Sequence, residues 1–379
     1  MAMQGFLVAG ALALAGGAAA AQDVVGPIKR LDDTGMAKCA VGGAYVRACT
    51  GTGQDGESGR DANARSSTDG RAGFRFTRIC ASGQAEGTGT CPVAPQVGTG
   101  PDQWACTRDD VTGLLWEIKQ ADGSIRDQDE LISMANWGWG FTTVTELRTL
   151  MNGDAVCGST AWDAATLTEM MSLLDFGIVG NVKIDTHFFP NTPTKYGYGV
   201  PYPRTEPDEG NYAGVNFIRA TGDGAYPGDG TYVRLVTRPP QFAGERYVIS
   251  ADGERAVDRW TRLVWQRCPV GTNYASGRCI GEPARLGWDA ALAAANAQPG
   301  WRLPNVKELV SLASLDDGKL DRHAFLGATS AVLWSSTPFA GGVGSAWEAS
   351  FDSYGTGWYP VGTDTLNAVL LVRDSSDAR

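Results

Sequence analysis

The stretch that decides the fold runs from residue 301 to residue 312 and reads WRLPNVKELVSL. A second copy of its pattern, WDAATLTEMMSL, occupies residues 162–173, and the Trp, Glu, Ser and Leu positions of the two stretches coincide. The second half of each copy spaces its apolar residues along one helix face, which predicts a short amphipathic helix. In the later copy Pro304 stands just before this helix, where proline is tolerated. Each copy therefore predicts a tryptophan ring, Trp162 or Trp301, that packs a helix N-terminus onto a core.

The repetition continues on both sides of this stretch. The strand-like segment 110–117 corresponds to 258–266, and the closing strand-like segment 232–238 corresponds to 368–373. The pair Pro239-Pro240 lies between the copies, and two prolines favour an extended linker. The sequence therefore predicts a first domain at 106–238, a linker at 239–256 and a second domain at 257–379.

A leader at residues 22–105 precedes the two copies. It is rich in Gly, Ser, Thr and Asp, and its turn signals predict mostly irregular structure. Residues 74–79 alternate apolar with basic or polar side chains, which predicts one edge strand. We expect the leader to be stapled by disulfides and to pack against the first domain. With short helices and many strand signals elsewhere, the fold class predicted for the chain is α+β.

The N-terminal residues 1–21 are predicted to be a signal peptide. An apolar run from Phe6 to Ala21 ends in small residues before Gln22, which predicts cleavage after Ala21 and export to the periplasm, the cell surface or the medium. No Lys or Arg precedes the run, and the first is Lys29, which departs from the usual pattern. The run is short for a membrane span. We therefore expect no span after cleavage.

The formal net charge of −10, with no basic run, disfavours a nucleic-acid partner. Binding to a phosphate backbone is driven largely by clustered Lys and Arg.

Eight cysteines in a chain predicted to be exported indicate disulfides. Three pairs would each close a loop of about ten residues, and the remaining two cysteines would tie the start of the first copy to the segment before Trp162. A zinc site is the rival interpretation, but no C-x-x-C pair occurs and the two His lie far from any Cys in sequence. The predicted pairs are Cys39–Cys49, Cys80–Cys91, Cys268–Cys279 and Cys106–Cys157.

Both histidines of the chain occupy one repeated position, two residues after an Asp. The pairs are Asp185 with His187 and Asp321 with His323. Each is a candidate for half of a catalytic pair, but the sequence has no G-x-S-x-G nucleophile elbow and no third group at a fixed spacing. We therefore favour a structural role for both histidines.

Arg302 and Glu308 flank the turn after Trp301. An ion pair that holds this turn is favoured over a ligand clamp. Trp162 and Trp301 are likewise interpreted as packing residues.

A Gly-rich segment at residues 352–359 predicts a loop with exposed aromatic rings. Rings on loops offer a large contact area with few rotamers and can stack on sugars, whereas strand alternation would turn some of them into core residues. The candidate ligand-binding residues are Trp334, Trp347, Asp352, Tyr354, Trp358 and Tyr359. In the matching segment 221–230, Asp223 and Asp229 lie among glycines and are weak calcium candidates, without EF-hand spacing. No other cofactor or metal is expected.

Several motifs of the second copy resemble the Lcl C-terminal domain family. They are Trp265, C-P-V-G at 268–271, C-I-G at 279–281, W-D-A-A at 288–291, G-W-R-L-P-x-x-x-E-L-x-S-L at 300–312, W-S-S-T at 334–337, Ala346-Trp347 with Phe351, and Val372-Arg373. The first copy resembles the family more weakly, since Asp163-Ala164-Ala165 replaces the R-L-P triplet. Part of the leader, Asp33 to Cys39 and Cys49 to Gly56, also resembles the N-terminal segment of members.

This resemblance implies a C-type-lectin-like fold in tandem copies and a role in surface adhesion through polysaccharide binding. We therefore expect an exported, non-enzymatic binding protein that recognises a glycan or a surface protein, with no oligomeric state predicted. A structural subunit of a pilus or surface assembly is one alternative. A relative of formylglycine-generating oxidases is another, but those use a reactive Cys pair, whereas Cys268 and Cys279 are predicted to be a structural disulfide.

Overall fold

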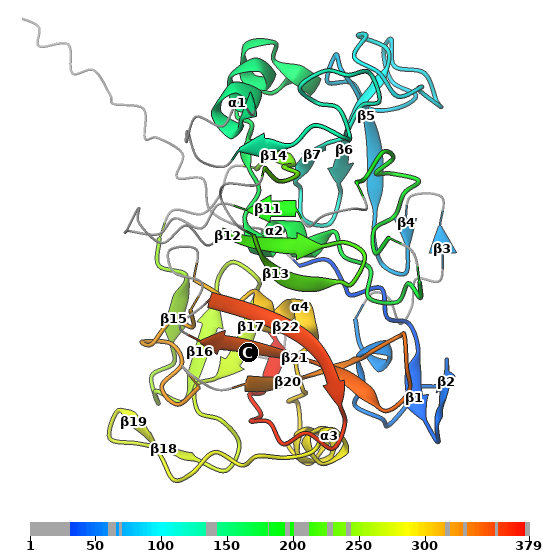
Figure 1. Cartoon of the computed structure of the whole chain (residues 1–379). Coiled ribbons are helices and arrows are strands. Elements are labelled where there is room, and N and C mark those ends of the chain that lie inside the picture. The colour runs from blue at the N-terminus through cyan, green and yellow to red at the C-terminus, as the bar shows by residue number, and fades with distance from the viewer. Residues whose placement is uncertain are drawn as a thin grey trace, which may run out of the picture.

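The computed structural model describes a sheet-rich α+β chain, as predicted. Figure 1 shows two halves stacked one above the other, with the N-terminal half above. The described residues are 31–59, 66–67, 70–133, 142–180, 182–193, 198–200, 212–225, 230–239, 244–314, 319–328, 332–352 and 355–375.

The first half is built on a five-stranded antiparallel sheet in the order β10-β14-β7-β6-β5. The edge strand β5 contains most of the predicted edge-strand segment 74–79, so that prediction is confirmed. β6, which lies between β7 and the edge strand β5, is buried along most of its length, with only Arg108 exposed. The bounds are Phe76–Cys80 for β5, Trp104–Asp109 for β6, Leu115–Glu117 for β7, Asp163–Ala164 for β10 and Leu235–Thr237 for β14.

The second half is built on a four-stranded antiparallel sheet in the order β15-β16-β17-β23. Arg302 adds a bridge to Val372 on the other side of β23, at the place where β10 pairs with β14 in the first half. The two sheets therefore place corresponding segments in the same order. The bounds are Tyr247–Ile249 for β15, Arg255–Asp258 for β16, Leu263–Gln266 for β17 and Val372–Asp374 for β23.

Each half also carries a three-stranded antiparallel sheet, and these two sheets meet in the middle of the molecule, where β13 lies beside β22 (Figure 1). The indole Nε1 of Trp358 donates to the carbonyl of Ala220 at 2.6 Å. A Cβ on Gly222 would lie 2.7 Å from the Trp358 ring, so this close approach requires glycine. The strands are β11 (Tyr198–Val200), β12 (Tyr212–Asn216), β13 (Thr221–Ala225), β20 (Val332–Pro338), β21 (Ser345–Asp352) and β22 (Gly355–Gly362).

Two short helices, α2 (Leu167–Ser172) and α4 (Val306–Val310), occupy the predicted repeated position and contact each other. Both begin with a capping box, formed by Thr166 with Glu169 in α2 and by Asn305 with Glu308 in α4. A longer helix lies at the outer end of each half, α1 (Val144–Gly153) in the first and α3 (Trp288–Asn296) in the second.

The remaining elements are short. They are the hairpins β1 (Cys39–Val41) with β2 (Ala44–Val46), β3 (Ser66–Ser67) with β4 (Gly70–Arg71) and β18 (Asn273–Ala275) with β19 (Arg278–Ile280), the parallel pair β8 (Ile132–Ser133) with β9 (Thr142–Thr143), and the 3-10 turns η1 (Asp55–Glu57) and η2 (Val156–Gly158).

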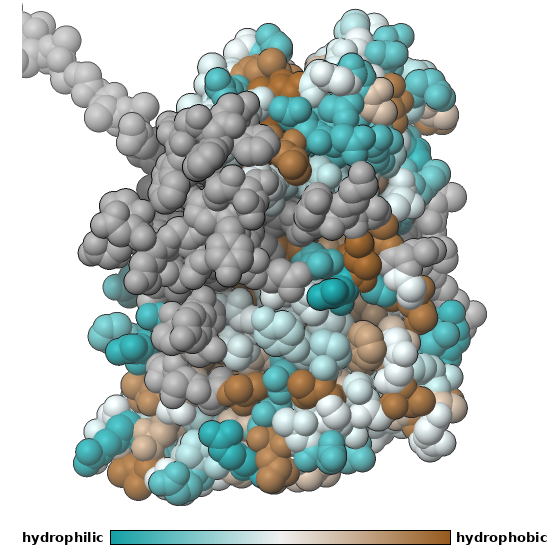
Figure 2. Space-filling model, in the orientation of Figure 1, coloured by the Kyte–Doolittle hydropathy of each residue, from teal (hydrophilic) through white to brown (hydrophobic). Residues whose placement is uncertain are grey.

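One hydrophobic core runs through both halves. Its members include Trp116 and Phe188 from the first half and Trp265 and Phe351 from the second. Phe176 packs edge-on against Trp347 across the boundary, with ring centroids 5.0 Å apart. On the face seen in Figure 2, apolar residues of the second half stand in small groups among polar ones. Burial of the large apolar side chains therefore binds the two halves into one unit.

We expected the leader to pack against the first half, but its residues 31–59 also contact the second half. Residues 31–59, here called the strap, bridge both halves and cover part of the second. Lys307 of α4 donates to the carbonyls of Asp33 (2.6 Å) and Ser172 (2.8 Å), which joins the strap, the first half and the second half at one ammonium group. The hydroxyl of Tyr45 donates to the carbonyl of Phe339. The strap reaches the second half because it lies against α4 and β20. Both elements carry buried apolar residues, and Lys307 of α4 and Thr337 of β20 are hydrogen-bonded to the strap.

The predicted boundaries also differ from the observed elements. β5 and the first residues of β6 lie in the predicted leader, yet they belong to the first-half sheet. The predicted linker 239–256 contains β15 and the start of β16, which belong to the second-half sheet. In sequence the Pro-Pro pair lies between β14 of the first sheet and β15 of the second, and the strands that follow it are too short to give a clear alternating pattern.

All four predicted disulfides are present, and they include all eight cysteines. The zinc alternative is therefore wrong. Within the described residues, no helix is long and apolar enough to cross a membrane.

Candidate functional site

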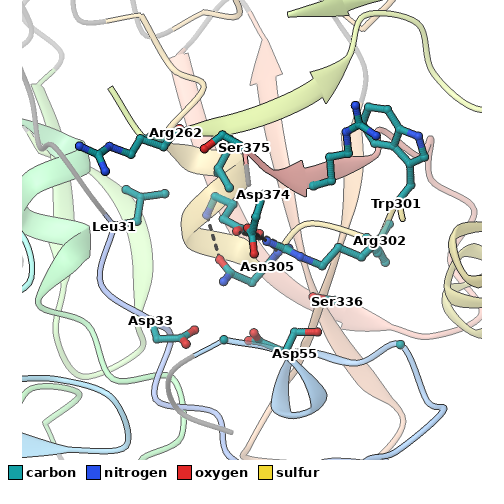
Figure 3. A pocket seen from close by; sticks show the side chains of 18 of the residues that line it. Leu31, Asp33, Asp55, Arg262, Trp301, Arg302, Asn305, Ser336, Asp374 and Ser375 are labelled. Atoms are coloured by element: carbon teal, nitrogen blue, oxygen red, sulfur yellow. Dashed lines mark hydrogen bonds and ion pairs between the residues drawn. The ribbon is translucent and has the colours of Figure 1, made fainter. Parts of the chain in front are cut away.

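Two hollows of similar size meet on the second half. The first, of about 770 Å³, lies between the strap and the segment that begins at Trp301, and we call it the strap hollow (Figure 3). The second, of about 760 Å³, lies beside the β18–β19 hairpin, and we call it the hairpin hollow. Trp301 and Arg373 line both hollows and so form the ridge between them. Each hollow is within the size range that holds a small organic ligand.

The ridge is held by its backbone and by a cation–π contact. The guanidinium of Arg373 lies 4.8 Å from the centre of the Trp301 ring. The amide of Trp301 donates to the carbonyl of Gln298 at 3.1 Å, and Gly300 before it has φ +76°, a turn conformation that favours glycine. Arg302 then exchanges two backbone hydrogen bonds with Val372, each 3.0 Å long. The partly exposed indole is therefore fixed in place by a sheet-like pairing.

The predicted ion pair of Arg302 and Glu308 is present. Both guanidinium nitrogens of Arg302 contact the two carboxylate oxygens at 2.6 Å, and a second contact reaches Asp374 at 3.3 Å. Glu308 also accepts from the amide of Asn305 at 2.8 Å, as part of the capping box of α4. Burial acts to lower the pKa of Arg302, but the adjacent carboxylates outweigh it and raise that pKa, so the guanidinium stays charged.

The strap closes its hollow with a buried carboxyl group. Asp55 accepts hydrogen bonds from the hydroxyls of Thr34 and Thr337, each 2.7 Å long, and so links the strap to β20. Burial, followed by the charge of Asp33, raises the pKa of Asp55 from 3.8 to about 7. In Figure 3 Asp33 and Asp55 lie on the strap side of the hollow, and Trp301 lies at its far end.

The hairpin hollow is lined by amides, a tyrosine and charged side chains of both signs, namely Asp252, Glu254, Arg255 and Arg373. Gln266 and Gln298 share a hydrogen bond of 2.8 Å on its wall, and Tyr274 and Asn273 come from β18. The disulfide Cys268–Cys279 closes the loop that carries β18 and β19. A covalent staple restricts the conformations open to this loop, so these polar groups are presented on a pre-formed surface.

One residue of the strap hollow has a left-handed backbone that side chains rarely adopt. Arg262 has φ +62°, and the corresponding residue of the first half, Gly113, has φ +79°. The turns match, because each donates its amide to an Asp carbonyl, Asp258 or Asp109, at 2.8 Å. The second half therefore keeps a side chain in a conformation that costs on the order of 1–3 kcal/mol, and this side chain is exposed at the mouth of the hollow.

A comparison with known families assigns most of the second half. Residues 254–373 match the Lcl C-terminal domain family. The matched range includes Trp301 and Arg373, which form the ridge, and most residues that line the hairpin hollow, whereas the strap lies outside it. No curated protein matches the chain.

The predicted aromatic site, which lies within the matched range, is largely buried. Trp334, Trp347 and Trp358 are at most 1% exposed, so these three ligand-binding candidates are core residues, and the prediction of an exposed ring at Trp358 is wrong. Residues 355–362 form β22 instead of a loop, and strand alternation turns Trp358 into the core. Tyr359 is 45% exposed, as expected, and its hydroxyl donates to the carbonyl of Gly222 at 3.2 Å. Tyr354 and the side chain of Asp352 lie outside the described residues.

The repeated Asp–His motifs are turns stabilised by the Asp. Asp185 accepts from the amide of His187 at 3.0 Å, and Asp321 accepts from the amide of His323 at 2.7 Å. Both histidine rings are exposed, and that of His187 lies 2.6 Å from the guanidinium of Arg78. The motif therefore repeats because the Asp side chain caps a turn, not because the imidazole fills a core position.

The calcium candidates lie largely outside the described residues. Asp223 is part of β13, but its side chain is not described, and Asp229 is not described at all. Among the side chains that the structure describes, no group of three or more His, Cys, Asp or Glu is arranged to hold a metal ion.

The two hollows do not follow from the sequence repeat. The analogy with Trp162 predicts a packing role for Trp301. Trp162 is indeed 1% exposed and donates its Nε1 to the carbonyl of Val156, whereas Trp301 packs only in part against the core beside α3 and also lines the two hollows. The signal that distinguishes the two rings is the neighbouring sequence. Trp301 follows Pro299-Gly300, whereas Trp162 follows a segment that the Cys106–Cys157 disulfide draws over its ring.

Proposed function

We propose that this chain is an exported, non-enzymatic binding protein whose second half recognises a glycan. In this proposal the two halves are tandem lectin-like domains, and the protein acts in adhesion at a surface. The strap and the first half support the binding domain from two sides.

Tandem duplication is supported by the correspondence of the two sheets. Strands β5, β6, β7 and β14 follow one another across the first sheet in the order in which β15, β16, β17 and β23 cross the second. The capping boxes of α2 and α4 add a second correspondence. Independent origins would have to produce both the same strand order and the same helix start.

Export is supported by the four disulfides, since such bonds persist in oxidising compartments. The same observation weighs against the oxidase alternative, because every cysteine of the chain is paired. A thiol titration of the native protein tests both points: we expect no reactive thiol, and one or two titratable thiols would favour the oxidase.

The observation that carries glycan binding is the partly exposed Trp301 between two hollows that both contain polar and charged side chains. Sugars present apolar C–H faces and rings of hydroxyl groups. An indole face supplies contact area for the first, and carboxylates, amides and guanidinium groups supply hydrogen bonds for the second. Both kinds of group meet at the ridge, on a surface fixed by a disulfide and a sheet.

A glycan array tests the proposal with the chain from Gln22 onward, in calcium and in chelator. We expect a specific signal that is lost in Trp301→Ala. The matched control is Trp260→Ala: Trp260 is also partly buried, with Arg246 4.6 Å from its ring centre, but it lines neither hollow. No signal with the unaltered chain, or a signal that both variants retain, would contradict the proposed site and favour a surface protein partner or a role in assembly.

A further inference from the structure

We propose that the glycan binds as an extended chain that crosses Trp301, with neighbouring sugar units in the strap hollow and in the hairpin hollow. This inference rests on the proposed function and deepens it. It specifies that the protein binds internal segments of a sugar chain and not a single terminal sugar.

The first argument is the shared ridge. Trp301 and Arg373 line both hollows, so a ligand that occupies one hollow and contacts the ridge also reaches the mouth of the other hollow. The volumes of about 770 and 760 Å³ each suit a ligand of drug-like size. One terminal sugar would therefore leave most of the lined surface empty, whereas a chain that crosses the ridge uses both hollows.

Both hollows combine carboxyl, guanidinium and amide groups, but they differ in charge balance, which points to two distinct subsites. Asp33, Asp55 and Asp374 bring carboxyl groups to the strap hollow, where they would accept hydrogen bonds from hydroxyl or amino groups. In the hairpin hollow, Asp252 and Glu254 are balanced by Arg255 and Arg373, and the amides of Gln298 and Asn273 would both donate and accept hydrogen bonds. In the strap hollow the carboxyl groups outnumber the guanidinium groups of Arg262, Arg302 and Arg373, and this excess of negative charge disfavours an acidic sugar because like charges repel.

A peptide fits this surface less well than a sugar chain. Extended peptides bind chiefly by adding a strand to a free sheet edge or by filling apolar pockets. Here β23 is already paired on both sides, with β17 and with Arg302. The lining of the hairpin hollow is mostly polar, with Pro269 and Val270 among its few apolar residues.

Length dependence of binding tests the inference. Calorimetry would compare oligosaccharides of one to six units, with cello- and chitooligosaccharides as the first series and the matching series of any array signal as the second. We expect affinity to rise at least tenfold between two and four units and then to level off. An oligogalacturonate series is expected to bind more weakly at every length.

Two variants assign the subsites. Asn273→Ala alters only the hairpin hollow and Asp374→Asn only the strap hollow, and both side chains are largely exposed, so the fold is expected to tolerate either change. We expect both to weaken binding of the six-unit chain at least threefold and one of them to leave the two-unit chain unaffected. Trp260→Ala is the control, and it is expected to leave the affinity for both the two-unit and the six-unit chain unchanged.

The outcomes separate this inference from the proposed function. Equal affinity for one unit and six units would overturn the extended chain while leaving glycan binding intact. Loss of binding to the two-unit ligand in both variants would also overturn the extended chain, because it would show that the two hollows act as a single site. Binding to a peptide array, with none to any oligosaccharide series, would overturn both proposals.

Discussion

Trp162 and Trp301 occupy the same place in the two halves but have opposite surroundings. Trp162 is buried under the η2 turn, which the Cys106–Cys157 disulfide holds over the ring. Trp301 is covered only in part, by the Arg373 guanidinium 4.8 Å from its ring centre and by the core beside α3, and its remaining surface forms the ridge between the two hollows. One scaffold thus uses the same residue as a core side chain in one half and as a wall of a cavity in the other.

The charges beside these tryptophans are reversed between the halves. Asp163 follows Trp162 and faces Arg238 at 3.7 Å, whereas Arg302 follows Trp301 and faces Asp374 at 3.3 Å. In both halves the arginine binds the glutamate of the capping box, Glu169 or Glu308. The scaffold therefore requires an arginine at the start of the helix and accepts it from either of two neighbouring strands. The arrangement of the second half leaves an exposed carboxylate, Asp374, in the strap hollow.

The largest effect is expected for Trp358→Ala. Trp358 is fully buried between the halves and lies in the shared core, so its removal should lower the free energy of unfolding by about 3–5 kcal/mol. Tyr359→Ala, at the exposed neighbour, should cost less than about 1 kcal/mol. Urea denaturation followed by circular dichroism measures both. Equal, small losses would place Trp358 outside the core.

Exchange of the charge arrangement tests the comparison of the two arginines. Arg238→Asp should cost about 3–5 kcal/mol, because it leaves the buried Glu169 without its partner. The double variant Arg238→Asp with Asp163→Arg reproduces the arrangement of the second half and should recover at least half of that loss. Thermal unfolding of the two variants gives the answer. A double variant no more stable than the single one would show that the two arginine positions are not equivalent.

The pH dependence of stability tests how the strap is held. Burial raises the pKa of Asp55 from 3.8 to about 7, so the folded chain keeps a proton that the unfolded chain releases between these values. The contribution of this group to stability is therefore greatest near pH 4, falls by on the order of 2–4 kcal/mol as the pH rises to about 7, and is constant above that. Urea midpoints between pH 4 and pH 8 should show this slope, and Asp55→Asn should remove it. An unchanged slope in the variant would exclude Asp55 as its source.

The smallest effect is expected at the turn where the halves differ by one side chain. Arg262→Gly gives the second half the glycine that the first half has, and relief of the left-handed strain should stabilise the fold by about 0.5–1 kcal/mol. Gly113→Ala does the opposite, because it adds a side chain at a left-handed position, and it should destabilise the fold by at least as much. Thermal unfolding compares the two variants with the unaltered chain. Loss of stability in Arg262→Gly would mean that the arginine side chain supports the fold.

Local features of the fold were predictable from the sequence. The repeated stretch predicts α2 and α4, and cysteine spacing predicts all four disulfides, because both depend on contacts between residues close in the chain or on a small number of partners. The short strands of the linker and the position of the strap depend on long-range contacts such as that of Lys307 with Asp33, which leave no local pattern.

The candidate site was less predictable than the fold. Glycines around Trp358 favour a loop, yet Gly222 allows the two three-stranded sheets to approach closely and bury the ring. The sequence repeat pairs Trp301 with Trp162, and the difference in their exposure arises from what covers them. That cover comes from η2 in the first half, whereas in the second half the strap leaves a hollow.

The central claim is that the ligand contacts Trp301 and not its counterpart Trp162. The most direct measurement is nuclear magnetic resonance of the tryptophan indole N–H signals during titration with the glycan selected on the array, with Trp301→Phe and Trp162→Phe used to assign the two signals. We expect the Trp301 signal to shift in proportion to occupancy while the Trp162 and Trp358 signals stay fixed. A shift at Trp162, or saturation of binding with no change at Trp301, would contradict the account.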